Sequence, residues 1–293
     1  MKVIRTIAEL RNELAGASAK QVGLVPTMGY LHEGHASLMR RARQMCDLVV
    51  ISIFVNPIQF GPNEDFETYP RDEQRDLALA EKEGVDVVFI PSVQEMYPVP
   101  TKTKIVVSDL TSSLCGASRP GHFDGVTTVV SKLFHIVKPA HAFFGMKDAQ
   151  QVAVIQQMVM DLNMDVNIVP CPILREKDGL ALSSRNVYLK PEEREQALVL
   201  SRALNHAKEV LQNGTPVTAS LLRQQLVDMI AAVPLADIDY VELMSFPQLE
   251  KLDSEQMLQD MKGQVLIALA VRFGSTRLID NLLVNPQEVA VSV

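Results

Sequence analysis

The sequence predicts an α/β fold, with a Rossmann-like doubly wound parallel sheet followed by a smaller α+β C-terminal domain. Short apolar runs rich in β-branched residues, such as residues 48–55, show no polar alternation and are typical of strands buried on both faces. These runs alternate with segments of helical periodicity as far as about residue 174, as in a series of right-handed β-α-β units. The pattern then changes, so we expect a first domain at residues 1–174 and a second at residues 175–293.

The predicted elements of the first domain follow in chain order. Leu38, Ala42 and Met45 recur at helical spacing, and Gly84 ends the next helical segment. Each short apolar run between such segments is predicted to be a strand, and residues 116–125 a loop. The predicted strands are residues 21–26, 48–55, 85–91, 104–110, 140–145 and 166–173, and the predicted helices are residues 35–46, 70–83, 127–138 and 148–163.

The second predicted domain begins with a polar, loop-like segment at residues 175–186. Pro191 opens a long helix, because the N–H group that proline lacks would be unpaired in the first turn anyway. A second helix is predicted near residues 219–232, and strands at residues 238–246 and 263–274 complete an α+β domain. Residues after about Val284 are expected to form a loose tail.

The composition excludes several classes of protein. Apolar residues make up 47% of the 293 residues, and the net charge of −7 disfavours nucleic acid as a partner. The N-terminus lacks a signal-like apolar segment, and the longest apolar run is too short to cross a bilayer. The three cysteines (Cys46, Cys115 and Cys171) suggest neither a disulfide framework nor a zinc site. We expect a cytoplasmic protein without a membrane partner.

The strongest local motif is MGYLHEGH, at residues 28–35. Gly29 and Gly34 bracket a tight loop between a strand and a helix that begins at about His35. A helix N-terminus favours phosphate, and glycines let the backbone approach it closely. His32 and His35 can donate hydrogen bonds to an α-phosphate as negative charge builds on it. The motif therefore predicts a nucleotide site suited to attack at the α-phosphorus.

Two other interpretations of His32 and His35 compete with this one. A metal site would need a third ligand and a helix beneath both imidazoles, whereas Gly34 and the preceding strand favour a loop. A purely structural turn is the other alternative, but two histidines in a glycine loop are unusual turn chemistry. We favour the phosphate interpretation.

Two further segments carry phosphate-binding chemistry. GMKD, at residues 145–148, joins a strand to a helix, where Lys147 can neutralise phosphate charge and Asp148 can cap the helix or bind ribose or Mg²⁺. LSSR, at residues 182–185, combines two hydroxyls with Arg185, a natural phosphate ligand. Taken alone, Lys147 would be a solvated surface lysine and SSRN an ordinary polar turn.

Together these segments resemble one family. PTMGYLHEGH is similar to the HxGH signature of the nucleotidyltransferase superfamily, and VPTMG followed by LHEGH resembles the pantothenate synthetase (pantoate–β-alanine ligase) family in particular. The resemblance covers nearly the whole chain. The other matching segments are SIFVNPIQFGPNED (52–65), SRPGHFDGV (118–126), FFGMKDAQQ (143–151), DGLALSSRN (178–186) and RLIDN (277–281).

The resemblance implies a ligase, EC 6.3.2.1, that joins pantoate to β-alanine through a pantoyl adenylate. ATP is the co-substrate, with Mg²⁺, and the protein is expected to be a homodimer. The first domain would bind nucleotide and pantoate, and the second would close over the ATP site. The rival interpretation is an HxGH nucleotidyltransferase that acts on another small substrate. A tRNA-charging enzyme and a non-catalytic nucleotide sensor are less consistent with the short acidic chain and its full set of charge-stabilising groups.

The resemblance also implies roles for individual residues. Gln59 and Gln151 would bind pantoate, and Gln59 would also bind β-alanine. Asp76 would help to hold Mg²⁺, although an Asp on a helix is usually solvated. Without the resemblance, Gln151 would be interpreted as a surface residue. His122 would lie near the β-alanine entry path or have no role. The expected catalytic residues are His32, His35, Lys147, Ser183, Ser184 and Arg185. The expected ATP-binding residues are Met28, Gly29, Tyr30, Leu31, His32, Glu33, Gly34, His35, Gly145, Met146, Lys147, Asp148, Leu174, Leu182, Ser183, Ser184 and Arg185.

The sequence departs from the family pattern in places. Met146 stands where the family has glutamate, Ala149 where an aromatic residue is common, and Tyr30 where the residue is often small or Asn. Because Lys147, Asp148 and Gln151 are retained, we expect the reaction to survive, with altered nucleotide affinity.

Overall fold

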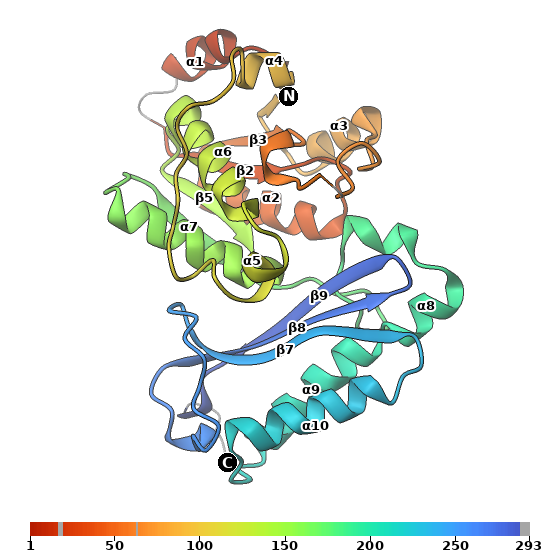
Figure 1. Cartoon of the computed structure of the whole chain (residues 1–293). Helices are drawn as coiled ribbons and strands as arrows, with labels where there is room; N and C mark the ends of the chain where they lie inside the picture. The colour runs from red at the N-terminus through yellow and green to blue at the C-terminus, as the bar shows by residue number, and fades with distance from the viewer. Residues whose placement is uncertain (17–19, 63, 288–293) are drawn as a thin grey trace. The chain divides into compact units, whose positions relative to one another are not determined.

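The computed structural model describes residues 1–16, 20–62 and 64–287. The chain divides into two compact units. The first comprises Met1–Met146 and Val154–Leu174, and the second comprises Lys147–Ala153 and the chain from Arg175 onward. Each unit has its own sheet, so each is described separately (Figure 1).

A six-stranded sheet forms the centre of the first unit, in the order β1-β4-β3-β2-β5-β6, with every pairing parallel (Figure 1). Apart from the edge strand β1, the order reverses direction between β2 and β5, as at the switch point of a Rossmann-like sheet. Ligands bind outside the carboxyl ends of strands at such a point. The predicted fold class is confirmed. The strands are β1 (Lys2–Ile4), β2 (Val22–Thr27), β3 (Leu48–Ile53), β4 (Val87–Phe89), β5 (His141–Gly145) and β6 (Asn167–Cys171).

Helices bury both faces of this sheet. Val25 and Ile51 pack on one face against Leu38 and Met39 of α2. Residues of opposite parity, such as Leu24, are equally buried, and α6 contacts β2. This two-sided burial explains why the strands read as continuous apolar runs. The helices are α1 (Ile7–Ala15), α2 (Glu33–Met45), α3 (Glu73–Lys82), α4 (Val93–Met96), α5 (Leu114–Ser118), α6 (His122–Val137) and α7 (Ala149–Asp161), with short 3₁₀ turns η1 (Pro57–Gln59) and η2 (Met146–Asp148). The part of η2 and α7 from Lys147 to Ala153 belongs to the second unit.

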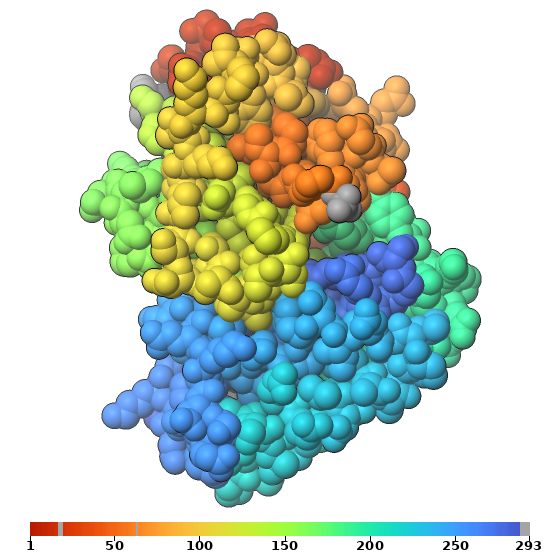
Figure 2. All heavy atoms as spheres, viewed as in Figure 1, coloured from red at the N-terminus to blue at the C-terminus, as the bar shows by residue number. Residues whose placement is uncertain are grey.

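One predicted strand of the first unit is wrong. Within the described part of the chain, residues 104–110 pair with no strand, and Figure 2 shows the stretch after α4, in yellow, on the surface. The side chains of α6 take the place of a neighbouring strand. Thr128 Oγ1 accepts the Ile105 N–H, and Thr127 Oγ1 donates to the Ile105 carbonyl. The sequence of this β-branched run resembles that of a strand, but the backbone of Ile105 is hydrogen-bonded to threonine hydroxyls of a helix and not to another strand.

Several predicted boundaries are also corrected. Helix α2 begins two residues before the predicted His35, and α6 begins at His122, inside the predicted loop at 116–125, which also contains part of α5. Strand β1 and helix α1 were not predicted from the sequence. Short edge strands and marginally amphipathic helices leave little periodic signal.

The second unit contains a three-stranded antiparallel sheet, β7-β8-β9, whose inner face packs against helices (Figure 1). Its core joins Leu222 and Leu226 of α10 and Leu204 of α9 to Val241 and Leu269 of the sheet. The elements are η3 (Ser184–Tyr188), α8 (Pro191–Gln196), α9 (Val199–Gln212), α10 (Ala219–Ala231), β7 (Ala236–Phe246), η4 (Leu258–Asp260), β8 (Gln264–Phe273) and β9 (Thr276–Val284).

Two predictions for the second unit need correction. The long helix from Pro191 is broken at Ala197 and Leu198, where the chain tightens into i→i−3 hydrogen bonds. Strand β9 was not predicted as a strand. Of the tail expected after Val284, residues 288–293 lie outside the described residues. No helix in the described ranges is long and apolar enough to span a bilayer.

Candidate active site

The turn after β2 is held in an unusual backbone conformation. Gly29 has φ +85° and Tyr30 has φ +51°. A Cβ on Gly29 would lie 2.9 Å from Ile53 Cγ2 and 3.0 Å from Asp76 Oδ2, so only glycine fits this position. Tyr30, a bulky residue in the left-handed region, carries backbone strain that its surroundings must offset.

Asp76 supplies much of that support. The residue is 1% exposed, and its carboxylate accepts the Tyr30 N–H through Oδ2 at 2.8 Å and the Leu31 N–H through Oδ1 at 2.6 Å. Burial raises the pKa of Asp76, although the two N–H groups and nearby Arg75 act in the opposite direction. The Arg75 guanidinium also lies over the Tyr30 ring, 4.7 Å from its centroid.

This geometry changes the interpretation of Asp76. The solvated helical carboxylate is excluded by its burial. The Mg²⁺ role stays a prediction that the geometry does not favour, because both oxygens already hold the turn. Among the described residues, no cluster of three or more His, Cys, Asp or Glu side chains is placed to hold a metal ion.

His32 and His35 cap helix α2 reciprocally. The Gly34 N–H donates to Nδ1 of His32 at 3.1 Å, and the His32 N–H donates to Nδ1 of His35 at 3.2 Å. A backbone N–H can only donate, so each Nδ1 is an acceptor and each neutral ring carries its proton on Nε2. The rings lie 4.1 Å apart between centroids. The capping arrangement therefore fixes the same tautomer for both imidazoles.

The structure corrects the local geometry that was expected for this motif. Residues 33–35 form the first turn of α2 and not a loop. The N–H groups of Gly29, Tyr30, Leu31, His32 and Gly34 are all hydrogen-bonded within the protein. The prediction of phosphate binding at this turn therefore rests on the imidazole side chains more than on these five backbone amides.

Gln59 lies on η1, just beyond the carboxyl end of β3. It is 8% exposed, and its Nε2 donates to Met28 Sδ at 3.1 Å, which links it to the HxGH turn. Its Oε1 accepts from Asn56 Nδ2 at 3.1 Å. A Cβ on Gly125 of α6 would lie 2.5 Å from the Gln59 Cα, so this glycine allows η1 to sit directly on α6.

A second polar group contacts the backbone of Gln59. Arg119 donates to both carboxylate oxygens of Glu64, at 2.7 and 2.5 Å, and to Nε2 of His122 at 3.0 Å. Because that nitrogen accepts, Nδ1 carries the proton and donates to the Gln59 carbonyl at 2.9 Å. His122, for which a substrate path or no role was expected, thus connects two loops and the backbone of η1.

In the second unit, Lys147 stands on η2 with its side chain 21% exposed, so it is not a freely solvated lysine. The Lys147 carbonyl accepts from Asn281 Nδ2 of β9 at 2.9 Å. Asp148 is exposed, with its carboxylate 3.9 Å from Lys147 Nζ. Gln151 is partly buried on α7. Gly145, Met146 and Leu174, predicted to contact ATP, belong to the first unit and are partly buried.

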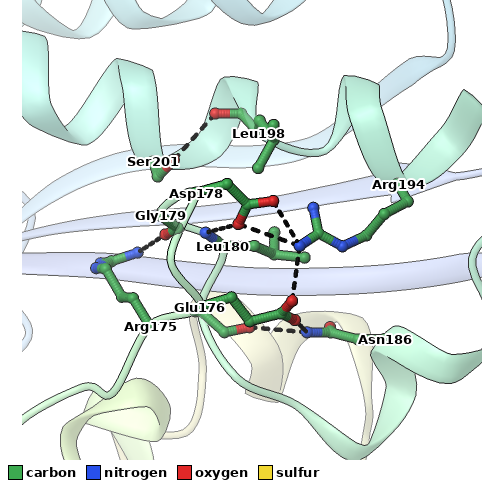
Figure 3. Close-up of polar contacts among 10 residues, drawn as sticks. Arg175, Glu176, Asp178, Gly179, Leu180, Asn186, Arg194, Leu198 and Ser201 are labelled. Atoms are coloured by element: carbon green, nitrogen blue, oxygen red, sulfur yellow. Dashed lines mark hydrogen bonds and ion pairs between the residues drawn. The ribbon is translucent and has the colours of Figure 1, made fainter.

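The segment from Arg175 to Asn186 is ordered by charged side chains (Figure 3). The Arg194 guanidinium bridges Glu176 and Asp178, each at 2.8 Å, and Asn186 donates to Glu176 at 3.0 Å. Arg175 pairs with the buried Asp280 of β9 through two bonds, at 2.6 and 2.9 Å. These contacts fix both ends of the segment from Arg175 to Asn186, which contains the predicted phosphate-binding residues.

The LSSR residues lie within this ordered segment. Ser183 Oγ accepts the Arg185 N–H and caps η3, as the polar-turn alternative predicted. The Ser183 hydroxyl still has its own proton to donate. Ser184 and Arg185 are partly buried on this turn, and Leu182, which precedes it, is also partly buried. A capping role and a phosphate role for Ser183 are compatible.

Some of the residues that hold these groups were not predicted from the sequence. Asn281 was noted only within a matching segment, and Tyr97, which contacts Asn56, was not noted at all. A polar pair inside an apolar strand, as at Asp280 and Asn281, was an available signal, because buried polar side chains need partners. Nothing local distinguishes Tyr97.

The comparisons with known proteins point to one family. The pantoate–β-alanine ligase family model matches residues 2–283. The chain is 58% identical to a pantothenate synthetase of Pelotomaculum thermopropionicum, over 97% of this chain and 99% of that protein. For one of Acetivibrio thermocellus the identity is 57%, over 97% and 100%.

Solved structures agree. A pantothenate synthetase from Thermus thermophilus matches with TM-score 0.89 and 47% identity, covering 96% of this chain and 99% of that one. A pantoate–β-alanine ligase from Francisella tularensis, complexed with a β,γ-ATP compound and β-alanine, matches with TM-score 0.80 and 34% identity, covering 98% and 100%. The chain belongs to the pantoate–β-alanine ligase (pantothenate synthetase) family.

Proposed function

We propose that this protein is the ATP-dependent ligase that condenses pantoate with β-alanine to give pantothenate, EC 6.3.2.1. Family membership over nearly the full length carries the proposal. The retained HxGH turn, Lys147, Gln151 and LSSR segment support it, because each supplies a group that this chemistry needs. ATP and β-alanine are the ligands named for the Francisella relative.

The first step is attack by a pantoate carboxylate oxygen on the α-phosphorus of ATP. A P–O bond forms to pantoate, the bond to the β-phosphate oxygen breaks, and pyrophosphate leaves with the electron pair. In our proposal His32 and His35 donate from Nε2–H to the α-phosphate as its charge grows, and Lys147 neutralises part of that charge. Ser183, Ser184 and Arg185 hold the remaining phosphates.

The second step joins the amine to the acyl group. The uncharged nitrogen of β-alanine attacks the acyl carbon of pantoyl adenylate, the C–O bond to AMP breaks, and the nitrogen loses a proton. We assign pantoate to the amides of Gln59 and Gln151, and β-alanine to Gln59. The phosphate contacts position the intermediate, so that the reaction becomes effectively unimolecular within the site.

The resemblance implies Mg²⁺ with the nucleotide, yet the side chains that the structure describes do not form a dedicated site for it. The carboxylate predicted for the metal, Asp76, is engaged by two backbone amides. No step of the proposed reaction is assigned to the metal.

Three broader expectations also belong to this proposal. Closure of residues 175–293 over the ATP bound by residues 1–174 would exclude water from the adenylate. A homodimer should sediment at about twice the 32.4 kDa chain mass. A cytoplasmic location would place the enzyme beside its ATP supply.

Pyrophosphate exchange into ATP tests the first step directly. We expect labelled pyrophosphate to enter ATP only when pantoate is present, with AMP released once β-alanine is added. Exchange without pantoate would contradict the assigned acid. Exchange without AMP release upon amine addition would favour a nucleotidyltransferase that leaves its nucleotide on the product.

A further inference from the structure

Tyr97, the residue after α4, begins a chain of side-chain hydrogen bonds that ends at Gln59. Its hydroxyl donates to Asn56 Oδ1 at 2.8 Å. Asn56, which is 1% exposed, donates from Nδ2 to the Gly125 carbonyl and to Gln59 Oε1, both at 3.1 Å. The end of α4, η1 and α6, all in the first unit, are thus connected through one buried amide.

The orientation of the Asn56 amide is determined from both ends. The Gly125 carbonyl can only accept, so it requires Nδ2 on its side. The Tyr97 phenol needs an acceptor for its proton, so it requires Oδ1 on the other side. Burial raises the pKa of Tyr97, which keeps the phenol protonated and able to donate. A flipped Asn56 would set its oxygen against the Gly125 carbonyl and leave the phenol proton without an acceptor.

The orientation of the Asn56 amide determines that of the Gln59 amide. Because Asn56 offers a donor, Gln59 presents Oε1 to it and Nε2 to the opposite side, toward Met28 Sδ. A thioether is a weak acceptor, so an oxygen of a bound acid would be a better partner for these N–H groups. A flipped Gln59 would instead face that acid with a carbonyl oxygen, which repels a carboxylate.

We propose that Tyr97 is a positioning residue of the pantoate site, whose hydroxyl orients Asn56 and thereby fixes Gln59 with its N–H groups toward the substrate. The inference rests on the proposed function, which places pantoate at Gln59. The ring of Tyr97 has its own contacts, with Phe54 at 6.1 Å between centroids and with Lys132 Nζ at 5.3 Å from its centroid. Removal of the hydroxyl alone therefore leaves the ring held in place.

The test compares Tyr97→Phe, Gln59→Ala and the double variant in steady-state kinetics with each substrate varied. We expect Tyr97→Phe to raise the KM for pantoate about tenfold, as for loss of one well-placed hydrogen bond in a site, and to leave the KM for ATP within about twofold. In the Gln59→Ala background, Tyr97→Phe should add nothing, because it acts through Gln59. Tyr240→Phe, the same change on β7, is the control and should leave all parameters unchanged.

A further variant, Asn56→Asp, tests the same chain of hydrogen bonds without changing Tyr97 or Gln59. Asn56→Asp keeps the acceptor for Tyr97 but removes both donors, so Gln59 should turn and the KM for pantoate should rise more than the KM for ATP.

Each contrary outcome has a distinct meaning. An unchanged pantoate KM in Gln59→Ala would overturn the assignment of pantoate to Gln59, and the inference with it. A raised KM in Gln59→Ala with no change in Tyr97→Phe would overturn the inference alone. Multiplied effects in the double variant would do the same, because they would show that Tyr97 acts by another route.

Discussion

The imidazoles of His32 and His35 do two tasks with two nitrogens. Nδ1 caps helix α2, and the tautomer that this requires places the proton on Nε2. Substitution by alanine removes both the helix cap and the Nε2–H donor. Substitution by asparagine keeps the helix cap and removes only the Nε2–H donor. This separation allows the catalytic contribution to be measured apart from the structural one.

For His32→Ala we expect the exchange rate to fall about a hundredfold or more, because loss of one oxyanion-type donor costs roughly 3–4 kcal/mol. Loss of the N-cap should also lower unfolding free energy by about 1 kcal/mol. His32→Asn should restore the stability but not the rate, since Asn is a good N-cap without the reach of Nε2. Pyrophosphate exchange and thermal melting measure the two effects. Full activity in His32→Asn would show that capping is the whole role of His32.

Asp76 offers a second test at the residue scale. Asp76→Asn keeps the size of the side chain but places an NH₂ group against the N–H of Tyr30 or Leu31. A buried donor without an acceptor costs about 1–3 kcal/mol, so we expect lower stability and slower exchange. Urea unfolding and the exchange rate are the measurements. Asp72→Asn, at the N-cap of the same helix, is the matched control and should be neutral because Asn caps as well as Asp. Equal effects of the two variants would contradict a special role for Asp76.

Strand β9 shows how one element can serve two functional segments. Asp280 and Asn281 are adjacent, so their side chains leave opposite faces of the strand, yet both are buried. Asp280 pairs with Arg175, at the start of the segment that carries LSSR. Asn281 holds the carbonyl of Lys147. The strand thereby ties the LSSR segment and the lysine turn to the core of the second unit.

Asn281→Asp should release η2 while keeping the size of the side chain. A carboxylate cannot donate to the Lys147 carbonyl and would repel it, so the lysine should lose its fixed position. We expect adenylate formation in a single turnover to slow about tenfold or more, with a stability loss of about 1 kcal/mol. Asn213→Asp, at the exposed end of α9, is the control. A normal single-turnover rate in Asn281→Asp would show that this hydrogen bond does not position Lys147.

Some strands and helices could be predicted from the sequence more accurately than others. The apolar strands β2, β3 and β5 were predictable because burial on two faces leaves a continuous apolar run. Residues 104–110 carry a similar pattern but bond to Thr127 and Thr128, and no local signal distinguishes a helix hydroxyl from a strand as a partner. The helix starts of α2 and α6 were placed late because histidine and glycine are poor markers of a first turn.

At the scale of the whole molecule, local motifs could be predicted from the sequence, whereas contacts between residues that are distant in the chain could not. The strand-to-turn motifs at Gly29 and Lys147 could be placed at carboxyl ends of strands from order alone. The partners that hold them, Asp76 and Asn281, lie 45 or more residues away in the chain. Such pairings follow from the topology, and one sequence contains no independent measure of them.

The pH dependence of stability is a property of the whole molecule with a local origin at Glu64. Burial alone would raise the pKa of Glu64, but its bonds to Arg119, the charge of Arg119 and the Gly61 N–H hold it below the ordinary value. A carboxyl group whose pKa is lower in the folded state stabilises the fold above its unfolded pKa. That stabilisation is lost as the pH falls through the folded pKa.

Glu64→Gln should therefore destabilise the protein most near neutral pH, by about 1–2 kcal/mol for a partly buried, two-bond pair. The difference from wild type should shrink as the pH falls from the ordinary glutamate value of about 4.3, where Glu64 of the unfolded chain is protonated, through the lower pKa of Glu64 in the folded protein. Urea unfolding of both proteins, from neutral pH to below about pH 4.3, measures this difference in the free energy of unfolding. Glu73→Gln, which removes an exposed ion pair with Arg5, is the control and should change stability little at any pH. A difference between Glu64→Gln and wild type that stays constant with pH would show that the Glu64–Arg119 pair does not lower the pKa in the folded protein.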